Sequence, residues 1–495
     1  MTTPRFSAPR FAGISLAALT FVMAGCAVGP NYVTPTAPKS LAFKEAPSVA
    51  NGWVPAQPLD GIPKGAWWSV FGDPYLDGLE SRVAVSNQTI AAAEAGYRAA
   101  RALTAVDRAS FFPTLTASSS GTRSGSGGAG STTTSTGATV ATSGTGRSSA
   151  ATSYGASLGA SWAPDLWGKI RRTVEADQAS AQASAADLAN ATLSAQTELA
   201  SDYIDLRILD EETRLYGETI AAYQKSLQVT QNQYDAGTAA RADVITAQTQ
   251  LLSAQASAAD IGVQRTEDEH AIALLIGVAP SELTIAPAPL IRTVPVAPVE
   301  LPSTLLQRRP DIASAERKVK QENALIGVQV AAYYPDITLS GSYGFSAANL
   351  GKLFNAANDV WSFGGDLSET LLDFGARRGR VREARANYDQ SVATYRQTVL
   401  TAFQGVEDQL AALRVLEGEA KIRDQALASA RQASAIALNE YRAGTVDYTT
   451  VVTAQATALS SAQSVLTVLR ARQVASVTLI ENLGGGWTTA DLPKH

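Results

Sequence analysis

The chain has 495 residues and a formal net charge of −5, and only 7% of its residues are aromatic. The acidic balance, with no basic stripe to compete with it, argues against a nucleic-acid partner. Cys26 is the only cysteine, and His270 and His495 are the only histidines, so a disulfide framework within the chain and a two-histidine zinc motif are excluded, and we expect no metal site and no enzyme.

The first 25 residues form a predicted signal peptide. Arg5 and Arg10 precede an apolar run from Phe11 to Met23, which is too short to be a transmembrane helix. Two small residues and Cys26 follow, and this ending resembles a bacterial lipoprotein signal. Cys26 is therefore the predicted site of covalent lipid attachment and the first residue of the mature chain, and we expect no other cofactor. An ordinary signal peptide with an incidental cysteine is the alternative.

Residues 26–73 form a predicted extended strap, and residues 74–278 form a first repeat. Proline is frequent from Gly29 to Pro63, where no regular period is found, which is typical of a segment that runs over a surface. The repeat opens with a predicted helix from Leu76 to Ser110. Phe111-Phe112-Pro113 ends this helix because proline continues a helix poorly.

A β-hairpin is predicted at about residues 113–165. Toward its end, apolar residues alternate with serine and glycine, which is the period of a strand. Before this alternation, the stretch from Ser118 to Ser149 is rich in glycine, serine and threonine, and we expect it to form a loop. The alternating apolar residues are Tyr154, Ala156, Leu158, Ala160 and Trp162.

A second β-hairpin is predicted at about residues 335–372. Its alternating apolar residues are Ile337, Leu339, Tyr343 and Phe345, and then Trp361, Phe363 and Leu367. Such strands are typical of a membrane β-barrel around a wet lumen, although a soluble sandwich shows the same alternation. Four strands cannot close a barrel, and lipid does not tolerate an open edge. We therefore predict that three chains share a barrel of twelve strands.

Long helical hairpins follow both β-hairpins. Predicted helices run from Lys169 to about Tyr234 and from Ala376 to about Tyr441, and at ~1.5 Å per residue each spans roughly 100 Å. Their tips, at residues 234–243 and 441–450, share the sequence Tyr-x-Ala-Gly-Thr. The remaining segments are a Pro-rich linker at 279–302, a second repeat at 303–483 and a C-terminal tail at 484–495.

The two repeats match each other as a tandem duplication. The tips align at an offset of 207 positions, and the proline motifs upstream align at 222, so the first copy has 15 extra residues between these motifs. The first long helix also contains a seam of small and apolar residues, interrupted at Asp202, which is typical of a coiled coil. The members of this seam are Ala185, Leu188, Thr192, Ala195, Leu199, Leu206 and Leu209.

Five motifs follow one another along the chain: Trp67-Trp68 with Phe71 and Asp73-Pro74, Arg308 to Ile312, Tyr333-Tyr334-Pro335, Phe374-Gly375, and the two tips. With these motifs the chain resembles the TolC-type outer-membrane efflux proteins, in the lipoprotein branch that serves resistance-nodulation-division pumps. The resemblance covers nearly the whole chain after Cys26.

This resemblance implies a fold, a function and partners. The fold is membrane α+β: an internally duplicated protomer in a homotrimer, whose 12-stranded β-barrel in the cell outer membrane continues into a long periplasmic α-helical barrel. The function is a passive exit duct of a tripartite efflux pump, which conducts drugs or other toxic organic molecules. The implied partners are a periplasmic adaptor, an inner-membrane resistance-nodulation-division transporter and outer-membrane lipid, and no catalysis is expected.

The resemblance also implies a gate at the periplasmic tips. We expect Tyr441 and Asp243 to hold it closed through hydrogen bonds, and the alternative is that Tyr234 and Tyr441 only pack on their own hairpins. Relatives often carry aspartates near the second tip where this chain has Thr450 and Thr453, so an acidic ring would require Asp447. The positions that match the tip motif or its surroundings are Tyr234, Gly237, Arg241, Asp243, Tyr441, Gly444, Asp447 and Thr453.

Three alternatives use the same features differently. A trimeric surface adhesin would carry coiled coils on a small barrel, but it would lack a duplicated protomer with two helical hairpins. A secreted hydrolase on a repeat scaffold would need a nucleophile with a plausible base, which the sequence does not offer. Within the family, a type I protein-secretion duct or a metal-efflux duct stays an alternative, although no methionine follows Cys26 to form a soft-metal relay.

Overall fold

The computed structural model describes residues 27–38, 43–45, 66–125, 150–295, 308–488 and 491–492. Cys26 and the predicted signal peptide lie outside these residues, as do most of the predicted strap and parts of the Gly/Ser/Thr tract and of the linker. The chain divides into two compact units, which are described in turn. The first takes in residues 1–33, 101–178 and 320–389, and the second takes in residues 34–100, 179–319 and 390–495.

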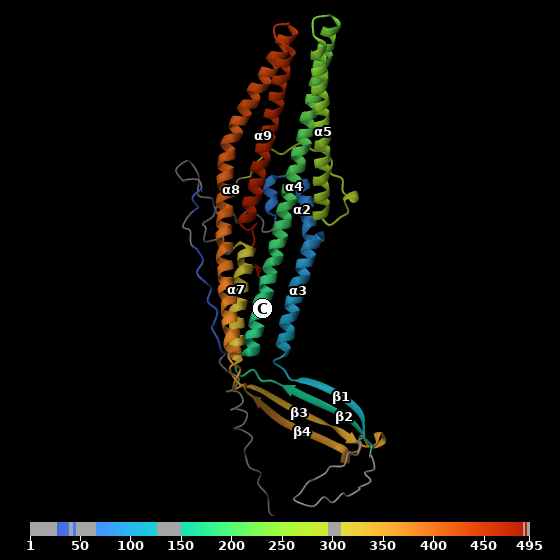
Figure 1. Cartoon of the computed structure of the whole chain (residues 1–495), viewed down its shortest axis with the longest axis vertical. Coiled ribbons are helices and arrows are strands. Elements are labelled where there is room, and N and C mark those ends of the chain that lie inside the picture. The colour runs from blue at the N-terminus through green and yellow to red at the C-terminus, as the bar shows by residue number, and fades with distance from the viewer. Residues whose placement is uncertain are drawn as a thin grey trace, which may run out of the picture. The chain divides into compact units, whose positions relative to one another are not determined.

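One antiparallel sheet, with its strands in the order β1-β2-β3-β4, dominates the first unit (Figure 1). The strands are β1 (Thr114–Gly125), β2 (Ala150–Trp162), β3 (Asp336–Ala347) and β4 (Asp359–Ser368). Leu158 lies opposite Tyr343, which in turn lies opposite Trp361. Because side chains alternate along each strand, this register gathers the predicted apolar residues of both repeats on one face of the sheet.

The other face of the sheet carries hydroxyl groups. The side-chain oxygens of Ser118 and Ser157 lie 2.9 Å apart, and those of Ser342 and Ser362 also lie 2.9 Å apart. Both pairs are cross-strand hydrogen bonds, which stabilise the pairing of neighbouring strands. The predicted period-two alternation is therefore confirmed, and it gives a sheet with one face suited to lipid and one suited to water.

The structure corrects one prediction for the first hairpin. Residues Ser118 to Gly125, which we expected to begin a loop, form the second part of β1 and pair with residues 150–157 of β2. Serine and glycine have low β-propensity by themselves, but pairing and cross-strand contacts with β2 outweigh that preference. Gly121, for example, lies against the ring of Tyr154. The rest of the predicted loop, residues 126–149, lies outside the described residues.

The helices of the two repeats have equal lengths. α3 (Gln88–Ala109) and α7 (Pro310–Ala331) have 22 residues each, α4 (Lys169–Asp235) and α8 (Ala376–Arg442) have 67, and α5 (Arg241–Leu275) and α9 (Tyr448–Asn482) have 35. This equality agrees with a tandem duplication. At ~1.5 Å per residue, α4 and α8 are each about 100 Å long. Among the described residues, no helix has both the length and the apolar composition needed to cross a membrane.

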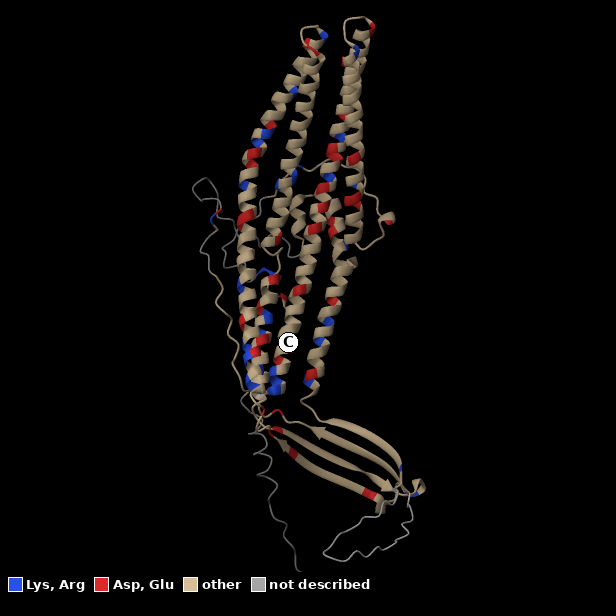
Figure 2. Cartoon of the chain, in the orientation of Figure 1, with Lys and Arg blue, Asp and Glu red and all other residues tan. Residues whose placement is uncertain are grey.

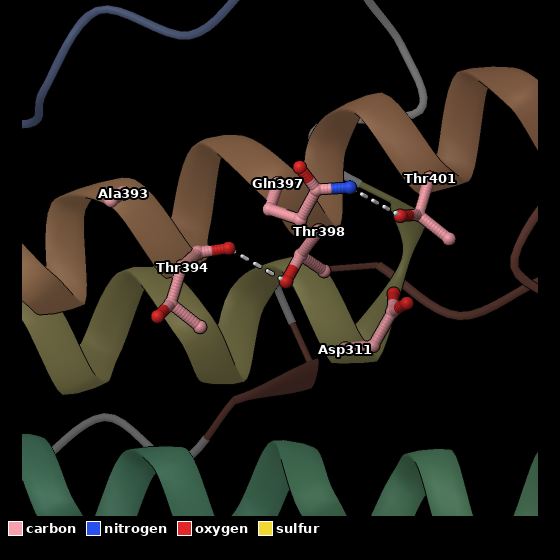
Figure 3. Close-up of a pocket in the computed structure, with 6 residues that line it drawn as sticks. All are labelled: Asp311, Ala393, Thr394, Gln397, Thr398 and Thr401. Atoms are coloured by element: carbon pink, nitrogen blue, oxygen red, sulfur yellow. Dashed lines mark hydrogen bonds between the residues drawn. The ribbon is translucent and has the colours of Figure 1, made fainter.

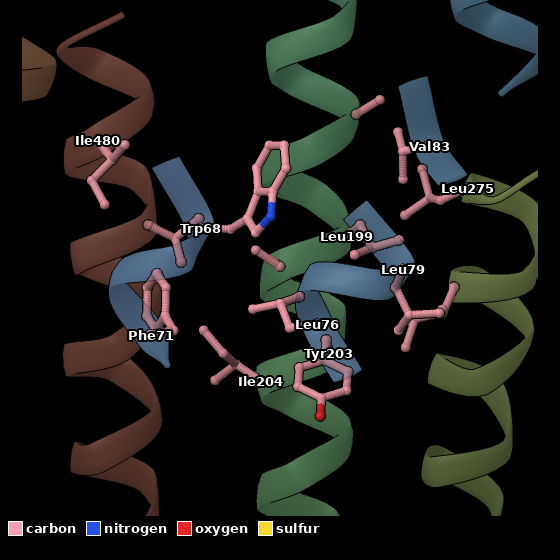
Figure 4. Packing of buried hydrophobic residues seen from close by; sticks show 14 of the residues in the cluster. Trp68, Phe71, Leu76, Leu79, Val83, Leu199, Tyr203, Ile204, Leu275 and Ile480 are labelled. Atoms are coloured by element: carbon pink, nitrogen blue, oxygen red, sulfur yellow. The ribbon is translucent and has the colours of Figure 1, made fainter. Parts of the chain in front are cut away.

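The main apolar core of the second unit surrounds the short helix η2 (Trp67–Phe71) and α2 (Pro74–Ser86) (Figure 4). Asp73 precedes α2 and caps it, because its Oδ1 accepts a hydrogen bond from the backbone N–H of Tyr75 at 2.9 Å. The other oxygen of Asp73 accepts a hydrogen bond from the Tyr203 hydroxyl of α4 at 2.6 Å. One carboxylate thus both starts α2 and fixes it against α4.

The predicted coiled-coil seam of α4 lies in this core and in the small core beside it. Ala195, Leu199 and Leu206 are buried in the main core, and Leu209 is buried in the next cluster along α4. The seam prediction is therefore confirmed for these positions. Asp202, which interrupts the seam, is half-buried beside other acidic residues, and burial raises its pKa to about 7, with further increases from the charges of Glu198, Asp268 and Asp205.

A buried ionic network ties the segment after α5 to α4. Asp210 of α4 accepts hydrogen bonds from Arg207 at 2.9 Å and from Arg265 of α5 at 2.7 Å. The two arginines then donate to backbone oxygens of the following segment, Arg207 to Ala286 at 2.9 Å and Arg265 to Ile285 at 2.6 Å. The carboxylate of Asp210 is therefore the centre that holds two helices and a loop together.

Glu80 is an unpaired acid in the core around α2. Its side chain is fully buried, and neither carboxylate oxygen has a hydrogen-bond partner among the described residues. Burial, with a smaller contribution from the charge of Asp77, raises the pKa of Glu80 from 4.5 to about 9. The folded protein therefore holds Glu80 as a neutral acid at neutral pH.

We expect Glu80→Gln to stabilise the protein at pH 8 but not near pH 4.5. Unfolded Glu80 loses its proton above its ordinary pKa, whereas folded Glu80 keeps it up to about pH 9, so the stability of the wild type falls as pH rises through this window. Glutamine has a similar shape and does not titrate. Thermal unfolding followed by circular dichroism should show a Tm gain of a few degrees at pH 8. A gain that is the same at both pH values would contradict the prediction.

Candidate functional site

The first tip is a tight turn between α4 and α5. Gly237 has a φ of +75°, a conformation that side chains rarely adopt, and its N–H donates to the Tyr234 carbonyl at 2.8 Å. The N–H of Thr238 donates to the Gln233 carbonyl at 2.8 Å. These bonds satisfy the last carbonyl groups of α4, so Gly237 serves the turn itself, as its place in the motif predicts.

Asp243 has a local role at the start of α5. The helix begins at Arg241, and the carboxylate of Asp243 accepts a hydrogen bond from the backbone N–H of Ala240 at 3.3 Å. An acid in the first turn also interacts favourably with the helix dipole. Asp243 therefore shapes the return of the chain at this tip, while the side chain of Arg241 is exposed to solvent.

The second tip repeats the turn with different side chains. Gly444 has a φ of +77°, and its N–H donates to the Tyr441 carbonyl at 2.9 Å. Asp447 precedes α9 and is exposed, but its side chain makes no capping hydrogen bond. Thr453 is exposed one turn and a half into α9, and its hydroxyl donates to the Thr449 carbonyl at 2.9 Å. Asp447 is thus an exposed acid at this tip with no side-chain hydrogen bond to another described residue.

The equivalent tyrosines of the two tips differ in burial. Tyr234 is 39% exposed, whereas Tyr441 is only 6% exposed. The ring of Tyr441 lies 5.2 Å from that of Tyr448, and both belong to an apolar cluster with Ala247 of α5 and Leu227 of α4. The second tip is therefore packed against the first helical hairpin of the same chain, and Tyr441 lies at the centre of that contact.

No hydrogen bond joins Tyr441 and Asp243 among the described residues. The Tyr441 hydroxyl is buried without a hydrogen bond of normal geometry. Burial raises the pKa of Tyr441, the nearby Thr230 hydroxyl opposes this shift, and the charge of Asp243 adds to it. The two predicted gate residues thus lie close enough to interact electrostatically, but apolar packing makes the contact between the hairpins.

Polar side chains continue this contact along α4 and α9. Gln455 donates to the Ser226 hydroxyl at 3.0 Å in a buried position, and farther along Gln463 donates to the Tyr216 hydroxyl at 2.9 Å. These pairs were not among the candidate residues from the sequence. The signal lay in a motif that follows both tips, Val-x-Thr-Ala-Gln, at Val244 to Gln248 and at Val451 to Gln455. Its last residue is buried in the second copy, as Gln455, and exposed in the first, as Gln248.

Comparisons with known proteins decide the family. The sequence model of the family described as "Outer membrane efflux protein" matches residues 79–278 and 301–485. The chain belongs to this family. The toluene efflux pump outer membrane protein TtgC of Pseudomonas putida is 28% identical to this efflux protein over 483 residues, which are 96% of this chain and 95% of the relative.

Two further comparisons agree. The probable outer membrane lipoprotein SilC of Salmonella typhimurium is 27% identical to the efflux protein over 475 residues, 94% of this chain and 97% of the relative. The solved structure of the outer-membrane channel OprN has a TM-score of 0.82 and 29% identity, over 93% of this chain and 100% of that one. The predicted fold class and location are thereby confirmed: the efflux protein has the fold of the TolC-type channels, and it is an exit duct in the outer membrane.

One open pocket of the efflux protein, of about 510 Å³, lies between α7 and α8 (Figure 3). Asp311 is its only ionisable residue, and the hydroxyl of Thr398 donates along its own helix to the Thr394 carbonyl at 3.0 Å. The pocket lacks the paired groups that acid–base or nucleophilic catalysis needs. Nor does the described part of the chain bring three or more His, Cys, Asp or Glu residues together in a group that could hold a metal.

Proposed function

We propose that three copies of the efflux protein assemble into one duct with a twelve-stranded barrel. Each chain supplies a sheet of four strands whose edges, β1 and β4, have no partner strand within the described chain. Unpaired edges are not tolerated in lipid, so the sheet must close with others, and twelve strands lie within the known range of such barrels. The duct is passive and has no catalytic residues.

The duct has its gate at the helical hairpin tips, and the observation that supports this best is the burial of Tyr441. A side chain that packs one hairpin against the other links the tips in a closed arrangement, and the arrangement must change if the hairpins separate. The neighbouring pair of Gln455 and Ser226 adds a buried hydrogen bond to the same contact. A periplasmic adaptor that docks on the tips would replace these contacts, and an inner-membrane transporter would supply the substrate.

The substrates are small organic molecules. The relative TtgC is named for toluene efflux, and the present chain has no methionine after Cys26 for a soft-metal relay. Secretion of whole proteins would require a duct coupled to a different class of inner-membrane transporter. These cargoes are distinguished by measuring efflux from intact cells while an organic solvent and a metal salt compete for the duct.

The duct itself is tested by single-channel recording. The full-length protein, purified as a folded trimer, should give a small, flickering conductance in a planar bilayer, because the tips hold the closed arrangement most of the time. Addition of the partner adaptor should lengthen the open periods. The proposal would be contradicted if a sample shown to be folded and trimeric gave no conductance, with or without the adaptor.

A covalent lipid on Cys26 anchors the same protein. The ending of the signal peptide supports this proposal, and Cys26 is the only thiol in the chain. We expect radioactive palmitate to label the wild type in cells and not the Cys26→Ser variant, whose signal peptide should also stay uncut. Because the barrel spans the membrane by itself, the variant with an alternative signal peptide should still conduct. Equal labelling of both proteins would overturn the assignment of Cys26.

A further inference from the structure

The start of α8 carries four arginines that the described chain leaves unpaired. They are Arg378, Arg380, Arg382 and Arg385, here called the α8 arginine patch. All four are exposed, and none forms an ion pair or hydrogen bond with another described residue. Figure 2 shows basic residues gathered at this end of the helix. Glu383 is the one acid among them, so the patch keeps a strong positive charge.

The adjacent arginine behaves quite differently. Arg377 donates to Asp373 at 2.9 Å and to Glu369 at 2.7 Å, and its guanidinium lies 5.3 Å from the centre of the Tyr333 ring. These contacts fix the loop between β4 and α8. Arg377 therefore serves the fold, and the patch begins with the next residue.

The first repeat shows what these positions do when they serve the fold. Arg171 matches Arg378 at the offset of 207 and forms an ion pair with Asp165 at 3.3 Å. The residue that matches Asp165 in the second repeat is Leu372, which cannot pair with an arginine. The second repeat keeps an equivalent ion pair, shifted to Arg377 and Asp373, and this shift leaves Arg378 and the exposed Leu372 outside the contact.

The loop before the patch presents apolar side chains to the surroundings. Leu371 is 91% exposed, Leu372 is 71% exposed and Phe374 is 93% exposed. They continue from β4, whose apolar face suits lipid. Exposed apolar residues followed within about three helical turns by exposed arginines are typical of the boundary between a hydrocarbon layer and its headgroups.

Two arginines farther along α8 provide a contrast with the patch. Arg396 and Arg414 lie 18 and 36 residues after Arg378, which are five and ten helical turns, so they share its face. Both contact the segment that follows the predicted lipid anchor, Arg396 through the Thr36 carbonyl at 3.3 Å and Arg414 through the Glu45 carboxylate. These two arginines of the second unit are therefore tied to the N-terminal segment, whereas the four of the patch have no such contact among the described residues.

We propose that the α8 arginine patch binds phosphate groups of anionic phospholipids at the periplasmic surface of the outer membrane. Guanidinium groups match phosphate oxygens in charge and geometry, and the exposed apolar loop places them at headgroup depth. The inference rests on the outer-membrane location of the protein and on the contact of β4 with lipid, and it is independent of the gate.

The test measures which lipids contact the protein. Full-length protein is reconstituted in phosphatidylcholine vesicles with a trace of spin-labelled phosphatidylglycerol or spin-labelled phosphatidylcholine, and electron paramagnetic resonance gives the fraction of each probe that the protein immobilises. We expect phosphatidylglycerol to be preferred about fivefold, the effect of roughly one arginine near an anionic surface. The preference should fall toward one in R378Q/R380Q/R382Q/R385Q and at high salt.

Matched variants separate this proposal from its rivals. R431Q/R442Q removes two exposed arginines elsewhere on α8 that have no partner among the described residues and should keep the preference. Replacement of the four patch residues by lysine should lower the preference only in part, because lysine keeps the charge but not the planar geometry. If the glutamine variant does not fold, R378Q/R382Q should halve the preference. The proposal is overturned if the wild type immobilises both lipids equally. It is also overturned if the glutamine variant keeps the wild-type preference for phosphatidylglycerol. Loss of the trimer in R378Q/R382Q also overturns it, because the patch would then bind a second copy.

The same vesicles report on the duct separately. A wild type that conducts ions without preferring the anionic lipid refutes the role of the patch and leaves the duct intact. A wild type that prefers the anionic lipid but does not conduct supports the patch and contradicts the duct.

Discussion

Replacing Tyr441 by alanine is expected to open the tips of the efflux protein and to raise its single-channel open probability by tenfold or more. Removing a large buried aromatic side chain costs about 3–5 kcal/mol. Part of that loss falls between the hairpins, where Tyr441 shares a cluster with Ala247 and Leu227. A share of about 1.4 kcal/mol already shifts the balance between closed and open tips tenfold in each chain.

Two control variants distinguish packing from hydrogen bonding at the tip. Tyr441→Phe keeps the ring and should stay near the wild type, because the Tyr441 hydroxyl has no hydrogen bond of normal geometry among the described residues. Tyr234→Ala removes the equivalent tyrosine of the first repeat, which is more than a third exposed, and should change little. Single-channel recording in planar bilayers measures all three. If Tyr441→Phe opens the channel as strongly as Tyr441→Ala, a hydrogen bond holds the gate instead.

The fold could be predicted because its signals are local and repeated. Period-two alternation predicted the strands of both repeats, and the register of Leu158, Tyr343 and Trp361 then followed from the need to keep apolar side chains on one face. The offset of 207 positions, which both ends of the long helices share, predicted that these helices are equal in length. Where the alternation was weak, as in Ser118 to Gly125, only the partner strand could reveal the structure.

The site could be predicted only in part because contacts across hairpins leave little local trace. Both tips have the Tyr-x-Ala-Gly-Thr sequence and the same turn, so the positions of Gly237 and Gly444 were predictable. Which tyrosine is buried depends on what lies beside it, and the identical motifs could not show that Tyr441 faces the first hairpin while Tyr234 does not. A symmetric sequence thus produces an asymmetric pair of tips.

The central position of Asp210 in the second unit could not be predicted from the sequence. It lies one position after the last residue of the predicted seam, where an acid is usually solvated. Its partners come from three places: Arg207 on the same helix, Arg265 on α5, and the backbone N–H of Ala288 at 3.3 Å. Only the fold brings these groups together. Because the carboxylate is buried, each of its hydrogen bonds is stronger than it would be in water.

Asp210→Ala is expected to lower the Tm of the protein by about 5 °C. The change leaves the guanidinium groups of Arg207 and Arg265 without their shared carboxylate, and breaking a buried ion pair from one side costs about 3–5 kcal/mol. The backbone contacts at Ile285 and Ala286 depend on the same arginines, so the segment after α5 should loosen first. Circular dichroism on heating measures the Tm, and limited proteolysis at the segment locates the loosening.

Glu218→Ala is the matched control for this prediction. Glu218 lies on α4 as well and pairs with Arg214, but both side chains are more than half exposed, and such pairs contribute about 0–1 kcal/mol. Its Tm should stay within about 1 °C of the wild type, and cleavage after α5 should not increase. Asp210→Asn, which keeps the shape and some of the hydrogen bonds, should lie between the two. Equal Tm values for Asp210→Ala and Glu218→Ala would mean that the buried carboxylate contributes no more than a solvated one, and the network would then be a consequence of the fold and not a cause of its stability.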